Sequence, residues 1–203
     1  MDAQIKSANH FTNPKDFWLQ FGSQAQVIQA IDLSITDEVL SAMPYYPELK
    51  RLYLKNNQIG CLEHLMAYHH LDGLTVSHNN LTDISGLRYL TNLTQLDFSN
   101  NQIEDISILA GLKKLEQLSF HHNRITNISA LSKLSKLISV DAANNQIVDA
   151  DFLSETKSLQ ELYLDHNLIG SVDRLRESKI WLSANDNPLH DSARMRTGCW
   201  IFG

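Results

Sequence analysis

Asp97, His121 and Asp141 carry side chains that could do chemistry together, and they stand 24 and 20 residues apart. A histidine between two carboxylates could bind a divalent metal ion. Alternatively, His121 could act as a general base with Ser99 or Ser119 as the nucleophile. In a third interpretation, the imidazole between two acids makes the binding of a partner depend on pH. The choice depends on the elements that position these residues.

Other signatures of catalysis or cofactor binding are missing from the sequence. It contains no P-loop, no GxGxxG and no HExxH, and His64 and His69 are not spaced for a metalloprotease helix. The two cysteines, Cys61 and Cys199, are too few for a disulfide framework. We therefore expect no cofactor and a cytoplasmic location, although export without a signal would leave the same pattern.

The charge balance argues against nucleic acid and membranes as partners. Lys and Arg number 17 against 23 Asp and Glu, which gives a net charge of −6 and a pI of about 5.8. Phosphate backbones and anionic lipids attract a positive surface, which this composition does not supply. The sequence has no apolar run of about 18 residues, and its first ten residues lack the order of a secretory signal.

Leucine and asparagine reveal an internal repeat. Leucine fills 30 positions, and asparagine, at 16, is twice as frequent as glycine. Residues 49–59, LKRLYLKNNQI, follow the pattern LxxLxLxxNx[LI], which returns every 22 residues. Further copies begin at Leu71, Leu93, Leu115, Leu137 and Leu159.

Each repeat predicts one strand and one turn. Apolar and polar residues alternate in the first half, which is typical of a strand with one buried face. In the second half apolar residues recur every three positions, as at Ile128, Leu131 and Leu134, which suits a short 3₁₀ or helical turn. Repeats of equal length can stack, with a parallel sheet on one side and the turns on a wider back.

One asparagine per repeat stands where the chain leaves the strand. Its buried amide can satisfy backbone groups that a turn would otherwise leave unpaired. We therefore predict a structural ladder with no direct role in function at Asn57, Asn79, Asn101, Asn123, Asn145 and Asn167.

With these motifs, residues 27–190 resemble the leucine-rich repeat family. The second half of each unit, such as TDISGLRYL at 82–90, is similar to the 22-residue subclass that includes bacterial internalins and phosphatase-regulatory subunits. The resemblance implies an α/β fold, a right-handed solenoid with a parallel β-sheet on its concave face and 3₁₀ or short helical turns on its convex face. It also implies a role in binding other proteins.

The irregular ends indicate how the array closes. We expect a single domain over residues 1–203, with a helical N-terminal cap at 1–26 and a degenerate first repeat at 27–48. Six repeats would follow at 49–180, and a last short repeat with a C-terminal cap at 181–203. Terminal units must cover a core that would otherwise stay open.

The first cap has a helix-start signal at Asn13, a favourable N-cap, and Pro14, which suits the first helical position. Phe17, Trp18 and Phe21 would form its buried face.

In the first repeat, Ile28, Ile31 and Leu33 suggest a strand, with Thr36 in the place of the ladder asparagine. Near the other end, Asn187 would continue the ladder.

Selectivity must come from the variable residues that point out of the concave sheet, because buried leucines contact no partner. We expect a protein partner that touches an aromatic residue at each end and brings a polar or basic group to the acids between them. The candidate residues are Arg51, Tyr53, Lys55, Asp97, His121, Asp141, Glu161, Tyr163, Asp165 and Trp181.

Three alternatives remain beside this prediction. The exposed aromatic residues could simply pack across strands. The chain could be the recognition part of a larger bacterial effector or adhesin. A metal or hydrolytic site could lie at Asp97, His121 and Asp141, but an open sheet gives no water-excluding pocket, so we expect no enzyme and no metal. We also expect a monomer.

Overall fold

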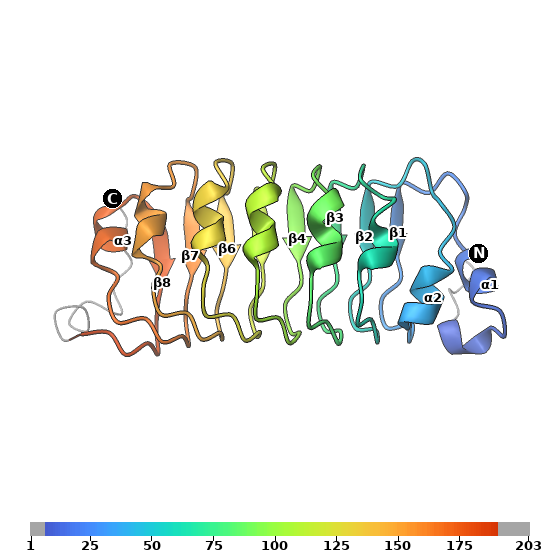
Figure 1. Ribbon diagram of the computed structural model, residues 1–203, viewed down its shortest axis with the longest axis horizontal. Coiled ribbons are helices and arrows are strands. Elements are labelled where there is room, and N and C mark those ends of the chain that lie inside the picture. The colour runs from blue at the N-terminus through green and yellow to red at the C-terminus, as the bar shows by residue number, and fades with distance from the viewer. Residues whose placement is uncertain (1–6, 191–203) are drawn as a thin grey trace.

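The computed structural model describes residues 7–190, which contain one parallel sheet of eight strands in sequence order (Figure 1). Each strand is three residues long, and its central side chain points toward the core, as does the apolar residue just after the strand. The strands are β1 (Val27–Gln29), β2 (Arg51–Tyr53), β3 (Gly73–Thr75), β4 (Gln95–Asp97), β5 (Gln117–Ser119), β6 (Ser139–Asp141), β7 (Glu161–Tyr163) and β8 (Trp181–Ser183).

The sheet keeps one register from end to end. Leu96 pairs with Leu74 on one side and with Leu118 on the other, and this row of central residues points into the core. Because side chains alternate along a strand, the residues before and after each central position point outward. The 22-residue spacing therefore places equivalent side chains side by side, and the predicted leucine-rich repeat solenoid is confirmed.

Short helical turns form a second layer against one face of the sheet, in front of the strands in Figure 1. Most are 3₁₀ turns, as the spacing of apolar residues predicts, but the last is an α-helix. Several begin with a side-chain oxygen accepting from a backbone N–H two residues on, as Asp83 does from Ser85 at 2.9 Å. The elements are η2 (Glu63–Leu65), η3 (Ser85–Tyr89), η4 (Ser107–Gly111), η5 (Ser129–Lys133), η6 (Asp151–Glu155) and α3 (Asp173–Glu177).

The asparagine ladder forms as predicted. The amide oxygen of Asn79 accepts from the backbone N–H of Ile59 at 3.0 Å, and its amide nitrogen donates to the carbonyls of Leu54 and Val76 at 2.9 and 3.0 Å. Asn187 makes the same kind of bonds, to Ile169 and Leu164. Each asparagine thus joins two successive repeats and satisfies backbone groups that are shielded from water.

The residue before each ladder asparagine lies in the left-handed region, with φ between 53° and 56°. Asparagine and histidine adopt this conformation more readily than most residues. Backbone geometry therefore favours asparagine or histidine at Asn56, His78, Asn100, His122, Asn144 and His166.

The N-terminal cap covers the first strand. It contains η1 (Ala8–His10) and α1 (Pro14–Trp18), and the Asn13 side chain accepts from the N–H of Lys15, which confirms the predicted N-cap. Phe17 and Trp18 are fully buried, and Phe21 packs partly against them. The apolar end of the sheet is thereby removed from water.

The first repeat differs from its prediction. Ile28 and Ala30 occupy the two inward strand positions, whereas Ile31 is exposed and Leu33 only partly buried. Thr36 is no ladder residue, because its hydroxyl accepts from the N–H of Val39 and caps α2 (Asp37–Ser41). This α-helix stands in place of the 3₁₀ turn of most later repeats, and it packs against α1.

The predicted C-terminal cap beyond residue 190, including Cys199, lies outside the described residues. Within residues 7–190, no helix has the length and apolar character needed to cross a membrane.

Candidate functional site

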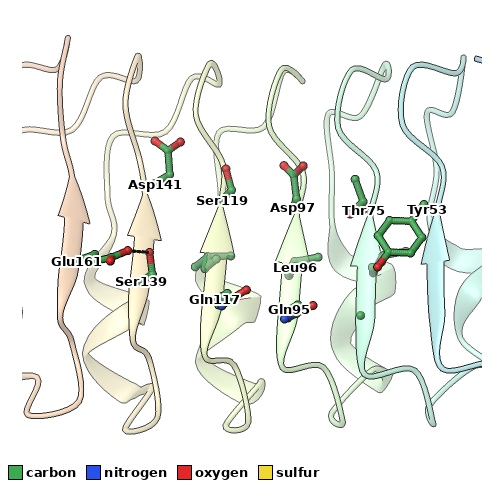
Figure 2. Close-up of a pocket in the computed structure, with 13 residues that line it drawn as sticks. Tyr53, Thr75, Gln95, Leu96, Asp97, Gln117, Ser119, Ser139, Asp141 and Glu161 are labelled. Carbon is green, nitrogen blue, oxygen red and sulfur yellow. Dashed lines mark hydrogen bonds between the residues drawn. The ribbon is translucent and has the colours of Figure 1, made fainter. Parts of the chain in front are cut away.

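The concave face contains an open groove of about 450 Å³ that runs from β2 to β7 (Figure 2). Tyr53 lines one end and Glu161 the other, and Asp97 and Asp141 stand between them. The register places Asp97, Ser119 and Asp141 in one row across β4, β5 and β6. The groove is therefore built from outward strand positions, whose backbone is held by the buried leucines.

The two central carboxylates are each anchored by one oxygen. Oδ1 of Asp97 accepts from the backbone N–H of Ser99 at 2.9 Å, and Oδ1 of Asp141 accepts from that of Ala143 at 3.2 Å. The hydroxyls of Ser99 and Ser119 bond to each other at 2.7 Å. These polar side chains are therefore held by hydrogen bonds within the chain, and apolar side chains line the groove beside them.

His121 does not lie between the two carboxylates in this row, because Ser119 holds that place. Its Nδ1 lies 3.5 Å from the amide nitrogen of Asn100, and its ring packs edge-on against His122. No group of three potential metal ligands occurs among residues 7–190, so the structure does not bring Asp97, His121 and Asp141 together as a metal site. Within residues 7–190, no hydrogen bond joins the imidazole of His121 to either serine hydroxyl.

The N-terminal end of the groove carries positive charge. Nε of Arg51 lies 3.4 Å from Oδ1 of Asp72, and both side chains are roughly half exposed. Hydrogen bonding with Tyr53 and then with Asp72 raises the pKa of Arg51. Lys55, on the chain that leaves β2, is exposed.

The C-terminal end combines aromatic rings with acids. The rings of Tyr163 and Trp181 meet with centroids 4.7 Å apart at an angle of 54°. Asp141 pairs in register with Tyr163, and Glu161 pairs with Trp181. Burial, and then the charges of Glu161 and Asp141, raise the pKa of Tyr163, so its phenol stays neutral and can donate a hydrogen bond at neutral pH.

Asp165 is bonded within the chain. Both of its carboxylate oxygens accept from the hydroxyl of Ser183, at 2.8 and 2.7 Å, and Oδ1 also accepts from the N–H of Asn185. This acid therefore fixes the chain that leaves β8.

Gln95, Gln117 and Ser139 are among the residues that line the groove but are not candidates from the sequence. Each of these three residues lies just before the central residue of its strand, and the alternation of side chains predicts that this position also points outward.

Known proteins match both the repeats and the fold. The family described as leucine-rich repeats in two copies matches residues 69–111, 91–133 and 113–155. These residues carry leucine-rich repeats, and the chain has the leucine-rich repeat fold. No curated protein matches it at a significant level by sequence.

Solved structures of internalins are similar to this chain. An internalin of Listeria monocytogenes, inlF, has a TM-score of 0.73 and 27% identity, over 84% of this chain and 50% of that one. Internalin C2 of the same organism has a TM-score of 0.64 and 27% identity, over 84% of each chain. This chain thus spans half the length of the first internalin.

A plant receptor shares the fold alone. The ectodomain of the Arabidopsis thaliana receptor kinase GASSHO1/SCHENGEN3, solved in complex with CASPARIAN STRIP INTEGRITY FACTOR 2, has a TM-score of 0.64 and 20% identity, over 76% of this chain and 20% of that one. Leucine-rich repeat domains of the internalin and receptor type are generally protein-interaction modules.

Proposed function

We propose that this chain is a non-catalytic recognition module that binds a protein partner through the concave groove. The observation that carries the proposal is the contrast between a shared scaffold and a groove lined by different residues in each repeat. At the usual strand spacing, eight strands span roughly 30–40 Å, which matches the interfaces of about 800 Å² per partner that specific protein complexes form.

The polar side chains of the groove and the aromatic pair beside it suit such an interface. Most of the binding energy at protein interfaces comes from a few anchor residues, among which tyrosine, tryptophan and arginine are frequent. Tyr163 and Trp181 provide such anchors beside Glu161, which lines one end of the groove. Tyr53 lines the other end, and Arg51 lies on the same strand.

A second proposal concerns the context in which the module acts. Because this chain corresponds to half of one internalin, it could serve as the recognition part of a larger effector or adhesin. Mass analysis of the native gene product tests this: a mass near 23.1 kDa would contradict it.

A pull-down from a lysate of the source organism tests the concave face. The native chain is compared with the double variant Tyr163→Ala and Asp141→Ala and with a convex control, Tyr89→Ala and Glu104→Ala, all verified as folded by circular dichroism. We expect one protein that the native chain and the control capture and the concave variant loses, with about 30-fold weaker binding once it is purified. Equal capture by the concave variant, or no capture by any chain, would contradict the proposal.

A further inference from the structure

Three acids of the concave face have no ion-pair partner among the described residues. On β3 to β8, the outward positions within each strand and just after it contain no lysine or arginine. They do contain Asp97, Asp141 and Glu161. Within residues 7–190 none of these three acids takes part in an ion pair, since the pairs that form are Arg51 with Asp72 and His166 with Asp186.

Two of these acids stand beside the aromatic pair. We call the four residues Asp141, Glu161, Tyr163 and Trp181 the β6–β8 corner. Asp141 lies next to Tyr163 and Glu161 next to Trp181, while the two rings contact each other across β7 and β8.

The acids and the rings occupy different sides of this corner. The hydroxyl of Ser139 donates to Oε2 of Glu161 at 3.0 Å, so the glutamate carboxylate leans toward β6, the strand that carries Asp141 (Figure 2). The rings of Tyr163 and Trp181 meet on the opposite side, toward β8. A ligand at the corner would therefore meet carboxylates on one flank and aromatic surface on the other.

The hydrogen bonds of the acids leave capacity for a ligand. Oδ1 of Asp141 accepts from the N–H of Ala143 and Oε2 of Glu161 from Ser139. Among the described residues no hydrogen bond uses Oδ2 of Asp141 or Oε1 of Glu161. Asp165, in contrast, uses both oxygens within the chain.

The guanidinium group of arginine fits this combination. It is planar and weakly hydrated, it stacks on aromatic rings, and it donates hydrogen bonds to carboxylates in a fork. We propose that the β6–β8 corner binds an arginine side chain of the protein partner. This inference rests on the proposed function, and it specifies which part of the concave face binds a basic residue of the partner.

A peptide titration followed by NMR tests the inference. The ¹⁵N-labelled chain is titrated with the end-blocked peptide Gly-Ser-Arg-Ser-Gly and with its counterpart that has neutral citrulline in place of arginine. The indole N–H resonance of Trp181, assigned with Trp181→Phe, is the reporter, and that of the fully buried Trp18 is the internal reference. We expect a saturable shift with arginine and about tenfold weaker binding with citrulline.

Charge-neutralising variants complete the test. Asp141→Asn and Glu161→Gln should each weaken binding of the arginine peptide about tenfold, whereas the convex control Glu104→Gln should leave it unchanged. Equal binding of citrulline, no saturable shift up to about 10 mM peptide, or unchanged binding by both corner variants would overturn the arginine site.

The two proposals can fail separately. Capture of a partner that depends on the concave face, without a preference for the arginine peptide, would overturn the arginine site alone. Capture that ignores the concave face would overturn the proposed function.

Discussion

The asparagine ladder and the concave surface repeat at the same interval along the chain, but only the ladder repeats in its chemistry. Ladder residues from Asn57 to Asn167 all bond to the neighbouring repeat. The outward strand position, in contrast, changes from Tyr53 to Asp97 to Tyr163 across the sheet. Buried backbone groups must be paired, so the interior admits few residues, whereas water satisfies the outward positions and leaves them free to vary. Recognition can therefore differ between repeats without a change of scaffold.

The largest expected effect on stability comes from the core, which supports both the asparagine ladder and the concave surface. Leu118 is buried in the central row between Leu96 and Val140. Leu118→Asp should lower the free energy of unfolding by at least about 4 kcal/mol and unfold neighbouring repeats together, because it removes apolar burial and adds an unpaired carboxylate.

Urea unfolding measures this effect, with Leu118→Met as the control. The methionine should cost less than about 1.5 kcal/mol because it nearly conserves volume. A Leu118→Asp variant as stable as the native chain would mean that the register is wrong.

A smaller loss is expected in the ladder. Asn101→Ala removes the acceptor for the N–H of Leu81 and the donor to the carbonyls of Val76 and Phe98. Because these backbone groups are buried, we expect a loss of about 2–4 kcal/mol in urea unfolding. The exposed neighbour Asn80 provides the control, and Asn80→Ala should change stability by less than about 0.5 kcal/mol. Equal effects of the two substitutions would remove the distinction between ladder and surface.

The smallest effect on stability is expected at the groove. Glu161 is exposed and keeps an acceptor for Ser139 after Glu161→Gln, so the free energy of unfolding should stay within about 0.5 kcal/mol of the native value. Thermal and urea unfolding measure it. A loss above about 2 kcal/mol would show that this residue belongs to the scaffold, and any loss of binding by the variant would then need a structural explanation.

Much of the scaffold could be predicted from the sequence, because its determinants repeat. The central leucines, the ladder asparagines and the N-cap at Asn13 all lie where the pattern indicates. The first repeat was harder to predict, since Ala30 is smaller than the residues at this position in the next four repeats and Thr36 caps a helix. That repeat packs against α1 on one side and against the next repeat on the other, so its sequence follows different constraints.

The candidate groove could be predicted only as columns of outward residues. The columns placed Asp141, Tyr163 and Trp181 near one another, as the register then showed. They gave no indication that Asp165 bonds to Ser183 or that His121 lies beside Asn100. These contacts join residues about 20 positions apart, and their geometry depends on side-chain rotamers that a repeat pattern does not specify.

By itself, the sequence determined the period, the inward and outward faces and the ladder, because burial and backbone hydrogen bonding constrain these features alike in every repeat. Only the tertiary structure decided which outward side chains bond to one another within the molecule and which have hydrogen-bonding atoms left for a partner. Glu161 leans toward Ser139 and Tyr163 toward Trp181, and this divergence places acids and rings on opposite sides of one corner. The physical reason is that a side chain chooses its direction from the partners on neighbouring strands, which come together only when the repeats stack.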